Sequence, residues 1–464
     1  MRNLNYCLNI SIVILAVTAR GYTLTLSKAM DMASQNNLPL QQARSTWLTN
    51  KNDKNIALSY LLPQISLAQS NSRHGITYPD ASNQGLDVKR NYDEKKGSIS
   101  MTQELFNMNS YYLFSRANQQ ALQDLLIYQD ALQNLSLTVS DQYFQLVLAI
   151  ENFIFLKSEE DETLKRLRDI EVQVKYGSMT KSQLLEMQAQ AKRVQANIIE
   201  AQQIINNQKD ILADSIGNNQ FTKISILGSA PKSLSLSLPA LEHWIKDAKD
   251  NNLHLKISEN NLQQAKLQQK ATASNYLPTL SLNANYNHYK YPSQSIKPDN
   301  GSASSITGDK LENRKYDGAI TLSYPLFNGG KRYYDNLKYQ ENIKLAKTTQ
   351  KNDTQVIIRT IKRLYRQLKL GIKVIETQKS ALESSKEMLR LSRISLKEGA
   401  VTVLETLENI SNVRSDQQSL ESSRYHYLFS LINLLTESGV ISPKDINEIS
   451  QDLNKIIDIP SVEE

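Results

Sequence analysis

The stretch YLLPQISL at residues 60–67 returns 215 positions later as NYLPTLSL at residues 275–282. In both places a Leu-Pro pair precedes alternating apolar and polar residues. Further along, Lys-Tyr-Gly at residues 175–177 matches Lys-Glu-Gly at residues 397–399 with an offset of 222. Leu-Phe-Asn at residues 105–107 matches residues 326–328 with an offset of 221, which is six more than 215. The two copies therefore differ by one main length change of about six residues, at a place where a loop tolerates it. Two copies are too few for a solenoid, so we expect each to form half of one closed structure.

The N-terminus has the pattern of a secretory signal peptide. Arg2 precedes an apolar run at residues 6–17, and small residues follow before position 21. A membrane anchor is the alternative, but the run is shorter than the roughly 20 residues that a spanning helix needs. The only cysteine, Cys7, lies in this segment, so the mature chain has no disulfide or thiolate chemistry. No later stretch is apolar enough for a spanning helix, so a membrane crossing would need β-strands.

Charge argues against a nucleic-acid partner. The net charge of +7 falls to +5 without Arg2 and Arg20, because 52 basic residues then face 47 acidic ones. The surplus is spread in mixed-sign runs, such as the one at residues 159–166, and not gathered on one element with interleaved aromatics. We interpret these runs as solvated faces of helices.

Between the repeated landmarks, apolar residues recur every seven positions, which predicts coiled-coil packing. The seam residues are Val139, Leu146, Phe153, Leu167 and Val174 in the first copy and Ile361, Leu368, Ile375, Leu382, Leu389 and Leu396 in the second. Each copy is expected to form a helical hairpin that turns at Gly177 or Gly399. Its leading arm, at residues 109–176 or 331–398, contains no proline and would reach about 100 Å at 1.5 Å per residue.

The other end of each copy has a period of two, which predicts strands. Leu280, Leu282 and Ala284 alternate with Thr, Ser and Asn, and residues 319–326, 64–67 and 98–102 follow the same pattern. A soluble sandwich would usually carry Lys and Glu on its polar face, whereas Ser, Thr and Asn are typical of a barrel lumen. The segments at 71–95 and 291–314 are expected to be long polar loops. Four strands cannot close a pore, because the smallest membrane barrels have about eight, so three chains would supply twelve.

These features together resemble the TolC family of outer-membrane efflux proteins. The resemblance covers residues 22–439 and rests on the paired Leu-Pro segments, on Leu-Phe-Asn-Gly-Gly at residues 326–330, on the two tip glycines and on the heptads. It implies a mainly α fold with membrane β: a homotrimeric, 12-stranded β-barrel in the outer membrane of a Gram-negative bacterium, continuous with a 12-helix coiled-coil α-barrel in the periplasm. It also implies a passive exit duct for small molecules or proteins, opened by a periplasmic adaptor protein and an inner-membrane transporter.

The duplication and the resemblance predict five segments. They are a signal peptide at 1–21, a first structural repeat at 22–217, a linker or equatorial segment at 218–238, a second structural repeat at 239–439 and a C-terminal equatorial tail at 440–464.

The resemblance also implies a periplasmic gate. Family members carry acidic residues six and nine positions after the second tip glycine, and these positions hold Glu405 and Glu408 here. The matching first-copy position is Gln183, with Glu186 three residues later. The alternative is that these side chains are ordinary solvated flanks of a coiled coil. The adaptor-contacting tips are expected at Tyr176, Gly177, Ser178, Met179, Glu398, Gly399, Ala400 and Val401.

No catalytic, cofactor or metal site is predicted. The five histidines show no ligand spacing, and neither a phosphate-binding Gly-rich loop nor a nucleophile motif occurs. The alternative to a channel is an exported structural or adhesive coiled coil, with the strands as a cap.

Overall fold

The computed structural model describes residues 22–78, 88–228, 231, 238–292, 294–298, 306–308 and 311–460. The predicted signal peptide lies outside these residues. The chain divides into two compact units, which we describe separately. The helical unit comprises Met1–Gln42, Asp130–Asn252 and Val356–Glu464, and the strand unit comprises Ala43–Gln129 and Leu253–Gln355.

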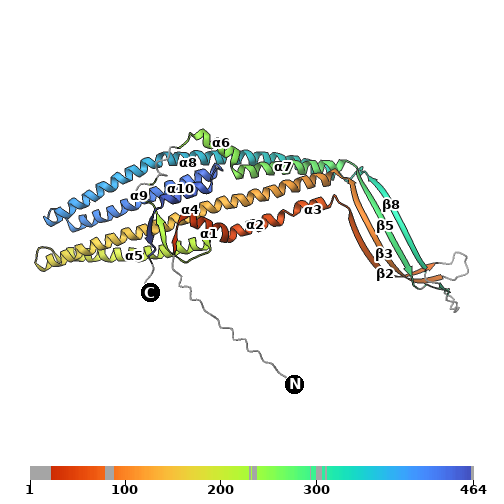
Figure 1. Cartoon of the computed structure of the whole chain (residues 1–464), viewed down its shortest axis with the longest axis horizontal. Coiled ribbons are helices and arrows are strands. Elements are labelled where there is room, and N and C mark those ends of the chain that lie inside the picture. Colours follow the sequence, from red (N-terminus) through yellow and green to blue (C-terminus); the bar gives the residue numbers. More distant parts are fainter. Residues whose placement is uncertain are drawn as a thin grey trace, which may run out of the picture. The chain divides into compact units, whose positions relative to one another are not determined.

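Two helices are much longer than the others. They are α4 (Met108–Lys175), with 68 residues, and α8 (Lys331–Lys397), with 67. Each is followed by a shorter partner, α5 (Lys181–Ile216) or α9 (Val403–Glu437), as Figure 1 shows. The predicted arms at 109–176 and 331–398 are confirmed to within one residue. In the described part of the chain, no helix combines the length and the apolar character needed to cross a membrane.

The heptad seam is buried in the helical unit. Val139 and Leu146 on α4 and Ile361 and Leu368 on α8 have no exposed surface. The first hairpin closes around a cluster in which Leu156 from α4 meets Val194, Ile198 and Ala201 from α5. Apolar side chains seven apart therefore bury the contact surface of each long helix, as the sequence predicts.

Both hairpins turn through the same backbone motif. Gly177 has φ +77° and Gly399 has φ +74°, a left-handed conformation that glycine adopts without steric cost. Ser178 N–H donates to the carbonyl of Gln173 at 2.9 Å, and Ala400 N–H donates to that of Ser395 at 2.8 Å. Each is the six-residue bond of a Schellman motif, which satisfies a carbonyl at the end of a helix.

The strand unit contains a twisted antiparallel sheet. Its long strands are β2 (Gln64–Tyr78), β3 (Val88–Phe106), β5 (Thr279–Tyr291) and β8 (Leu311–Ser323), paired in that order (Figure 1). The short strands β6 (Gln294–Pro298) and β7 (Ile306–Gly308) extend it beside β3. The predicted polar loops at 71–95 and 291–314 are therefore wrong over much of their length. Backbone groups make the ladder whatever the side chains are, so the strands continue after the apolar alternation ends.

Shorter helices complete both units. The strand unit has α3 (Asp53–Ser59), α7 (Leu253–Ala273) and most of α2 (Leu38–Asn50). The helical unit has α1 (Leu26–Asn36), α6 (Leu241–Asn251) and α10 (Pro443–Asp452).

A second, small sheet in the helical unit was not predicted. It joins β1 (Tyr22–Leu24), β4 (Phe221–Ile226) and β9 (Lys455–Asp458), which are far apart in the sequence. The buried Tyr143 of α4 attaches the small sheet to this helix. Its hydroxyl donates to the carbonyl oxygens of Leu24 on β1, at 3.1 Å, and of Ser225 on β4, at 2.7 Å.

Candidate functional site

The candidate site lies at the turn ends of the two hairpins in the helical unit. The first turn carries the most exposed aromatic side chain of this region, Tyr176, which is 81% exposed. Gly177 and Ser178 are also exposed, and Glu398, Gly399 and Ala400 form a similar exposed turn on the second hairpin. Within the expected tips, these residues have the accessibility that a partner-binding role needs.

Two of the expected tip residues are not fully accessible. Met179 is half-buried and packs against the hydrophobic cluster below the turns. Val401 is half-buried as well. Met179 therefore contributes to packing beside any contact with a partner, because an apolar side chain gains free energy when it is buried on apolar surface.

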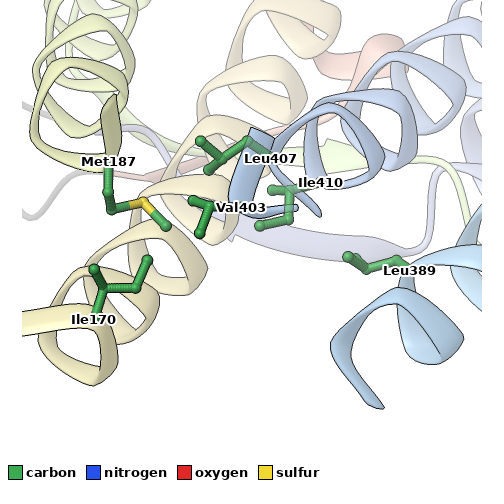
Figure 2. Packing of buried hydrophobic residues seen from close by; sticks show 6 residues of the cluster. All are labelled: Ile170, Met187, Leu389, Val403, Leu407 and Ile410. Atoms are coloured by element: carbon green, nitrogen blue, oxygen red, sulfur yellow. The ribbon is translucent and has the colours of Figure 1, made fainter. Parts of the chain in front are cut away.

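The hydrophobic cluster joins all four helices just behind the turns. Val403, Leu407 and Ile410 project from α9 and bury their side chains with one residue from each of the other helices (Figure 2). The residues from the other helices are Ile170 on α4, Met187 on α5 and Leu389 on α8. The two hairpin ends are thus packed on each other within one chain.

Glu405 and Glu408 lie on the exposed side of α9. Both are exposed, whereas Thr406 and Leu407 between them are buried. The i, i+3 spacing places both carboxylates on one helical face, as the sequence predicts. Glu405 also lies in the first turn of α9, where its backbone N–H donates to the Thr402 hydroxyl at 3.1 Å. Its negative charge interacts favourably with the positive end of the helix dipole.

The first-copy position has a clear local role. Thr180 and Gln183 form a reciprocal capping box at the start of α5: Gln183 N–H donates to the Thr180 hydroxyl at 3.3 Å, and Thr180 N–H donates to the Gln183 side-chain oxygen at 2.9 Å. Gln183 is half-buried and Glu186 is exposed. The amide therefore stabilises a helix start without adding charge at this end of the hairpin.

Sequence reasoning missed two ion pairs deeper in the same region. Glu159 on α4 lies 2.9 Å from the Arg414 Nε of α9, and Glu162 on α4 lies 3.0 Å from an Arg393 nitrogen on α8. Arg166, one turn along α4, also contacts Glu162 at 3.3 Å. These residues link the first hairpin to both helices of the second.

The interpretation of residues 159–166 as a solvated face is wrong for the two glutamates. The side chain of Glu159 is 5% exposed and that of Glu162 is 18% exposed. Burial raises the pKa of Glu159, and the Arg414 guanidinium lowers it in part. The sequence held one signal for this burial: the i, i+3 spacing of the two glutamates, which places both on the same side of α4.

A polar cavity adjoins the pairs. Its volume is about 350 Å³, and Glu159, Glu162, Arg393 and Arg414 are among its lining residues. That volume exceeds the share of one water molecule several-fold. No group of three or more His, Cys, Asp or Glu side chains is placed to hold a metal ion in the residues that the structure describes.

Comparison with known proteins gives the family. The model of the outer membrane efflux protein family matches residues 29–218 and 244–440, in two parts that the duplication explains. TolC of Vibrio cholerae is 22% identical over 399 residues, which cover 85% of this chain and 86% of the relative. The alkaline protease secretion protein AprF of Pseudomonas aeruginosa is 20% identical over 433 residues, covering 93% and 87%.

Solved structures share the fold. The CmeC outer membrane channel of Campylobacter jejuni superposes with a TM-score of 0.72 at 16% identity, over 98% of each chain. CusC gives a TM-score of 0.73 at 15% identity, over 90% of this chain and 94% of the other. The long coiled-coil helices, the strands and the duplicated family match agree, and the chain therefore belongs to the outer membrane efflux protein family, as a Gram-negative outer-membrane channel for efflux or type I secretion and not an enzyme.

Proposed function

We propose that three copies of this chain form a channel-tunnel whose closed end lies at the hairpin tips and is opened by a periplasmic adaptor and an inner-membrane transporter. The family implies a trimeric channel that works with efflux-pump components. In this proposal each copy supplies four strands of a 12-stranded barrel in outer-membrane lipid and a third of a 12-helix coiled-coil barrel. Small molecules or proteins pass through it, driven by the transporter.

The unpaired edges of the sheet carry this proposal. Among the described residues, β2 pairs with β3 alone and β8 pairs with β5 alone. A long strand edge presents a row of N–H and C=O groups, which are costly to leave unpaired in lipid. Pairing β8 of one copy with β2 of the next satisfies both edges, and repeating that contact closes a ring.

The duplication supports the proposed division of the chain. We place the two repeats at 22–217 and 239–439, with the linker at 218–238 and the tail at 440–464. The linker contains β4 and the tail contains α10 and β9, so both contribute to the small sheet or its surroundings in the helical unit. That placement supports an equatorial role for both segments.

For the gate, we propose that Glu405 and Glu408 from three copies surround the periplasmic entrance. Their exposure on one face of α9 beside an exposed turn supports this assignment. Six carboxylates around one aperture would attract cations and repel one another. Gln183 and Glu186 would line the same entrance from the first hairpin with half the acidic charge.

For the adaptor, we propose the exposed turns as the contact. Tyr176 and the exposed residues of both glycine turns support it, because exposed apolar surface at a protruding end favours a protein partner. A cysteine at Ser178 or Ala400 should crosslink to a periplasmic adaptor, since the mature chain has none of its own. Labelling of these cysteines by an impermeant reagent from outside intact cells would contradict the assignment.

The assembly can be tested with cysteines at the two sheet edges. Gln64 begins β2 and Ser323 ends β8, so both lie at the same end of the sheet. Within one chain three strand spacings of about 4.8 Å separate them, which a disulfide cannot span. The double cysteine variant should give covalent trimers in denaturing gels, and each single variant should give none. A detergent-solubilised monomer that forms no such product would contradict the proposal.

The gate can be tested in planar bilayers. Replacing both Glu405 and Glu408 with Ala should lower cation preference in asymmetric salt and weaken block by divalent cations. The control replaces Glu376 and Glu383 with Ala. Both residues are exposed on α8, far from the turn, and the double substitution removes the same amount of charge as the first variant. Unchanged reversal potentials and divalent block in the first variant would make Glu405 and Glu408 ordinary solvated residues.

A further inference from the structure

The register of the large sheet separates an apolar face from a polar face. Residues directly opposite one another in neighbouring strands project to the same side of a sheet. Leu280 faces Leu322 and Leu282 faces Ile320, while Leu67, Ile99, Tyr286 and Tyr316 lie opposite one another in a row across all four long strands. The band from Leu322 to Tyr316 covers seven residues, and the six steps between them span about 20 Å. It is close to the apolar height of an outer-membrane barrel, about 25 Å.

Two tyrosines mark the far limit of this band. Tyr286 and Tyr316 have ring centroids 5.0 Å apart, at the end of the band farthest from the point where β3 continues into α4. Tyrosine rings are typical of the boundary between lipid chains and headgroups, because the ring is apolar and the hydroxyl is polar.

Beyond the tyrosines the same face becomes basic. Every second residue of a strand stays on that face. Counted from the row of Leu67, Ile99, Tyr286 and Tyr316, Arg314 lies two residues further, Lys95 and Lys290 lie four, and Arg73 lies six. The residues that stand between are Gln69, Asn71, Gly97 and His288. We define the basic belt as the four residues Arg73, Lys95, Lys290 and Arg314. They come from four different long strands, so the belt crosses the whole sheet.

Acidic neighbours neutralise the belt only in part. Glu312 lies 3.7 Å from the Lys290 ammonium and 3.8 Å from the Arg314 guanidinium, and Asp93 lies 2.9 Å from Arg73. Four cations against two carboxylates leave a charge of +2, and His288 adds to it when protonated. The Arg73 side chain is 83% exposed and that of Arg314 is 63% exposed. These charges are therefore available to a ligand on the lipid-facing side.

The opposite face of the same strands differs in the surroundings of its basic side chains. Lys315 pairs with Asp317 at 3.1 Å, and the Lys96 ammonium lies 5.5 Å from the centre of the Tyr289 ring. Each of these lysines is the sequence neighbour of a belt residue, but its side chain projects to the other side of the sheet. The surplus charge next to the apolar band is thus a property of one face.

We propose that the basic belt binds phosphate-bearing lipid headgroups at the outer surface of the outer membrane. The inference rests on the proposed function, in which the apolar face of the sheet contacts lipid. A lipid that packs its chains against the leucine and tyrosine rows places its phosphate beside Arg314, Lys290 and Lys95. Arg and Lys at this depth gain charge-assisted hydrogen bonds to phosphate oxygens. Three copies would carry twelve belt cations around the barrel.

The test compares two double variants of the full-length protein. The belt variant is Lys95→Gln with Arg314→Gln, and the matched control is Lys96→Gln with Lys315→Gln, which removes the same charge from the same two strands. Titration of the detergent-solubilised trimer with phosphatidylglycerol, followed by native mass spectrometry, counts the lipids bound. Each basic side chain near an anionic lipid surface strengthens binding about five-fold, so the belt variant should lose roughly 30-fold in affinity. The control should stay within about two-fold of wild type.

The remaining outcomes are distinguishable. Equal loss in both double variants, or none in either, would overturn the belt, as would equally strong binding of phosphatidylcholine without net charge. Displacement of the lipid by millimolar inorganic phosphate would show a free-phosphate site and would also overturn it. A spin label at Ile320 tests the proposed function separately: contact with membrane-dissolved oxygen supports a lipid-facing apolar face even when the belt fails. A label that reports only water there would contradict the proposed barrel itself.

Discussion

Replacing Glu151 with Gln should stabilise the helical unit and flatten its dependence on pH. Glu151 lies on α4 and is 7% exposed. One carboxylate oxygen is 3.5 Å from the Tyr425 hydroxyl, and the other is buried without a hydrogen-bond partner in the described part of the chain. Its pKa is raised to about 8, chiefly by burial and also by the Glu421 carboxylate, although Arg424, Lys455 and the Tyr425 hydroxyl lower it in part.

The sign of the effect follows from proton binding. Between the ordinary pKa of about 4.5 and the folded pKa of about 8, the folded state holds a proton that the unfolded state has released. Stability therefore falls as pH rises through this window, by at most 1.4 kcal/mol per pH unit. Between pH 6 and pH 8, the Glu151 proton accounts for about 2 kcal/mol of unfolding free energy. Glutamine keeps the shape of the protonated acid and cannot ionise, so the variant should retain this stability at pH 8.

Hydrogen exchange of the α4 amides around residue 151, compared at pH 6 and pH 8 after correction for intrinsic rates, measures this difference locally. The wild type should lose roughly 30-fold in protection between the two pH values, which corresponds to about 2 kcal/mol. The Gln variant should lose far less. Asp161→Asn is the control, because it removes an exposed carboxylate from the same helix. An identical pH dependence in wild type and the Glu151 variant would refute the reasoning.

Three further substitutions test the hairpin ends by thermal melting of the purified protein. Arg414→Ala leaves the Glu159 carboxylate buried without its partner and should cost about 3 kcal/mol, most of which a second change, Glu159→Gln, should restore; no recovery would contradict the pairing. Thr180→Ala removes the capping box with Gln183 and should cost about 1 kcal/mol, with Thr180→Ser close to wild type. Gly399→Ala meets no atom within 4 Å, so its cost of about 1 kcal/mol should come from the positive φ alone; a neutral effect would contradict that account.

The sequence predicts the long helices well because their contacts are periodic. Val139 and Leu146 mark the seam, and Gly177 marks the turn, so local pattern and tertiary packing give the same answer. The long strands were located from the apolar face and were therefore cut short where that face becomes charged. The small sheet could not be predicted, because Tyr22–Leu24 and Lys455–Asp458 both pair with β4, and β4 is roughly 200 residues away from each of them in the sequence.

The candidate site was predictable only in part. The exposed turns and the shared face of Glu405 and Glu408 follow from helix geometry. Burial of Glu159 does not, because a run of acidic residues has the same composition on a solvated face and in an interface. What decides burial is Arg414 on another helix, and that partner is more than 250 positions away in the sequence.

The ion pairs also show how the two copies have diverged. An offset of 222 aligns Glu159 and Glu162 with Ala381 and Ser384, which carry no charge. The same offset aligns Arg393 with Glu171, an acid in the place of a base.

This divergence gives the two hairpins complementary charge at the positions where they meet. A first-copy hairpin presents acids on α4, and a second-copy hairpin presents arginines on α8 and α9. Two first-copy hairpins in the same contact would place Glu171 at the position of Arg393, opposite Glu162, whereas Lys192 at the position of Arg414 would keep a base opposite Glu159. Loss of the Arg393 partner from a largely buried glutamate, with a second acid in its place, is destabilising. Unlike hairpins therefore pair more favourably than like hairpins, which is how specificity arises from a repulsive as well as an attractive element. A duplicated chain needs such a distinction, because identical copies could pair with themselves as readily as with each other.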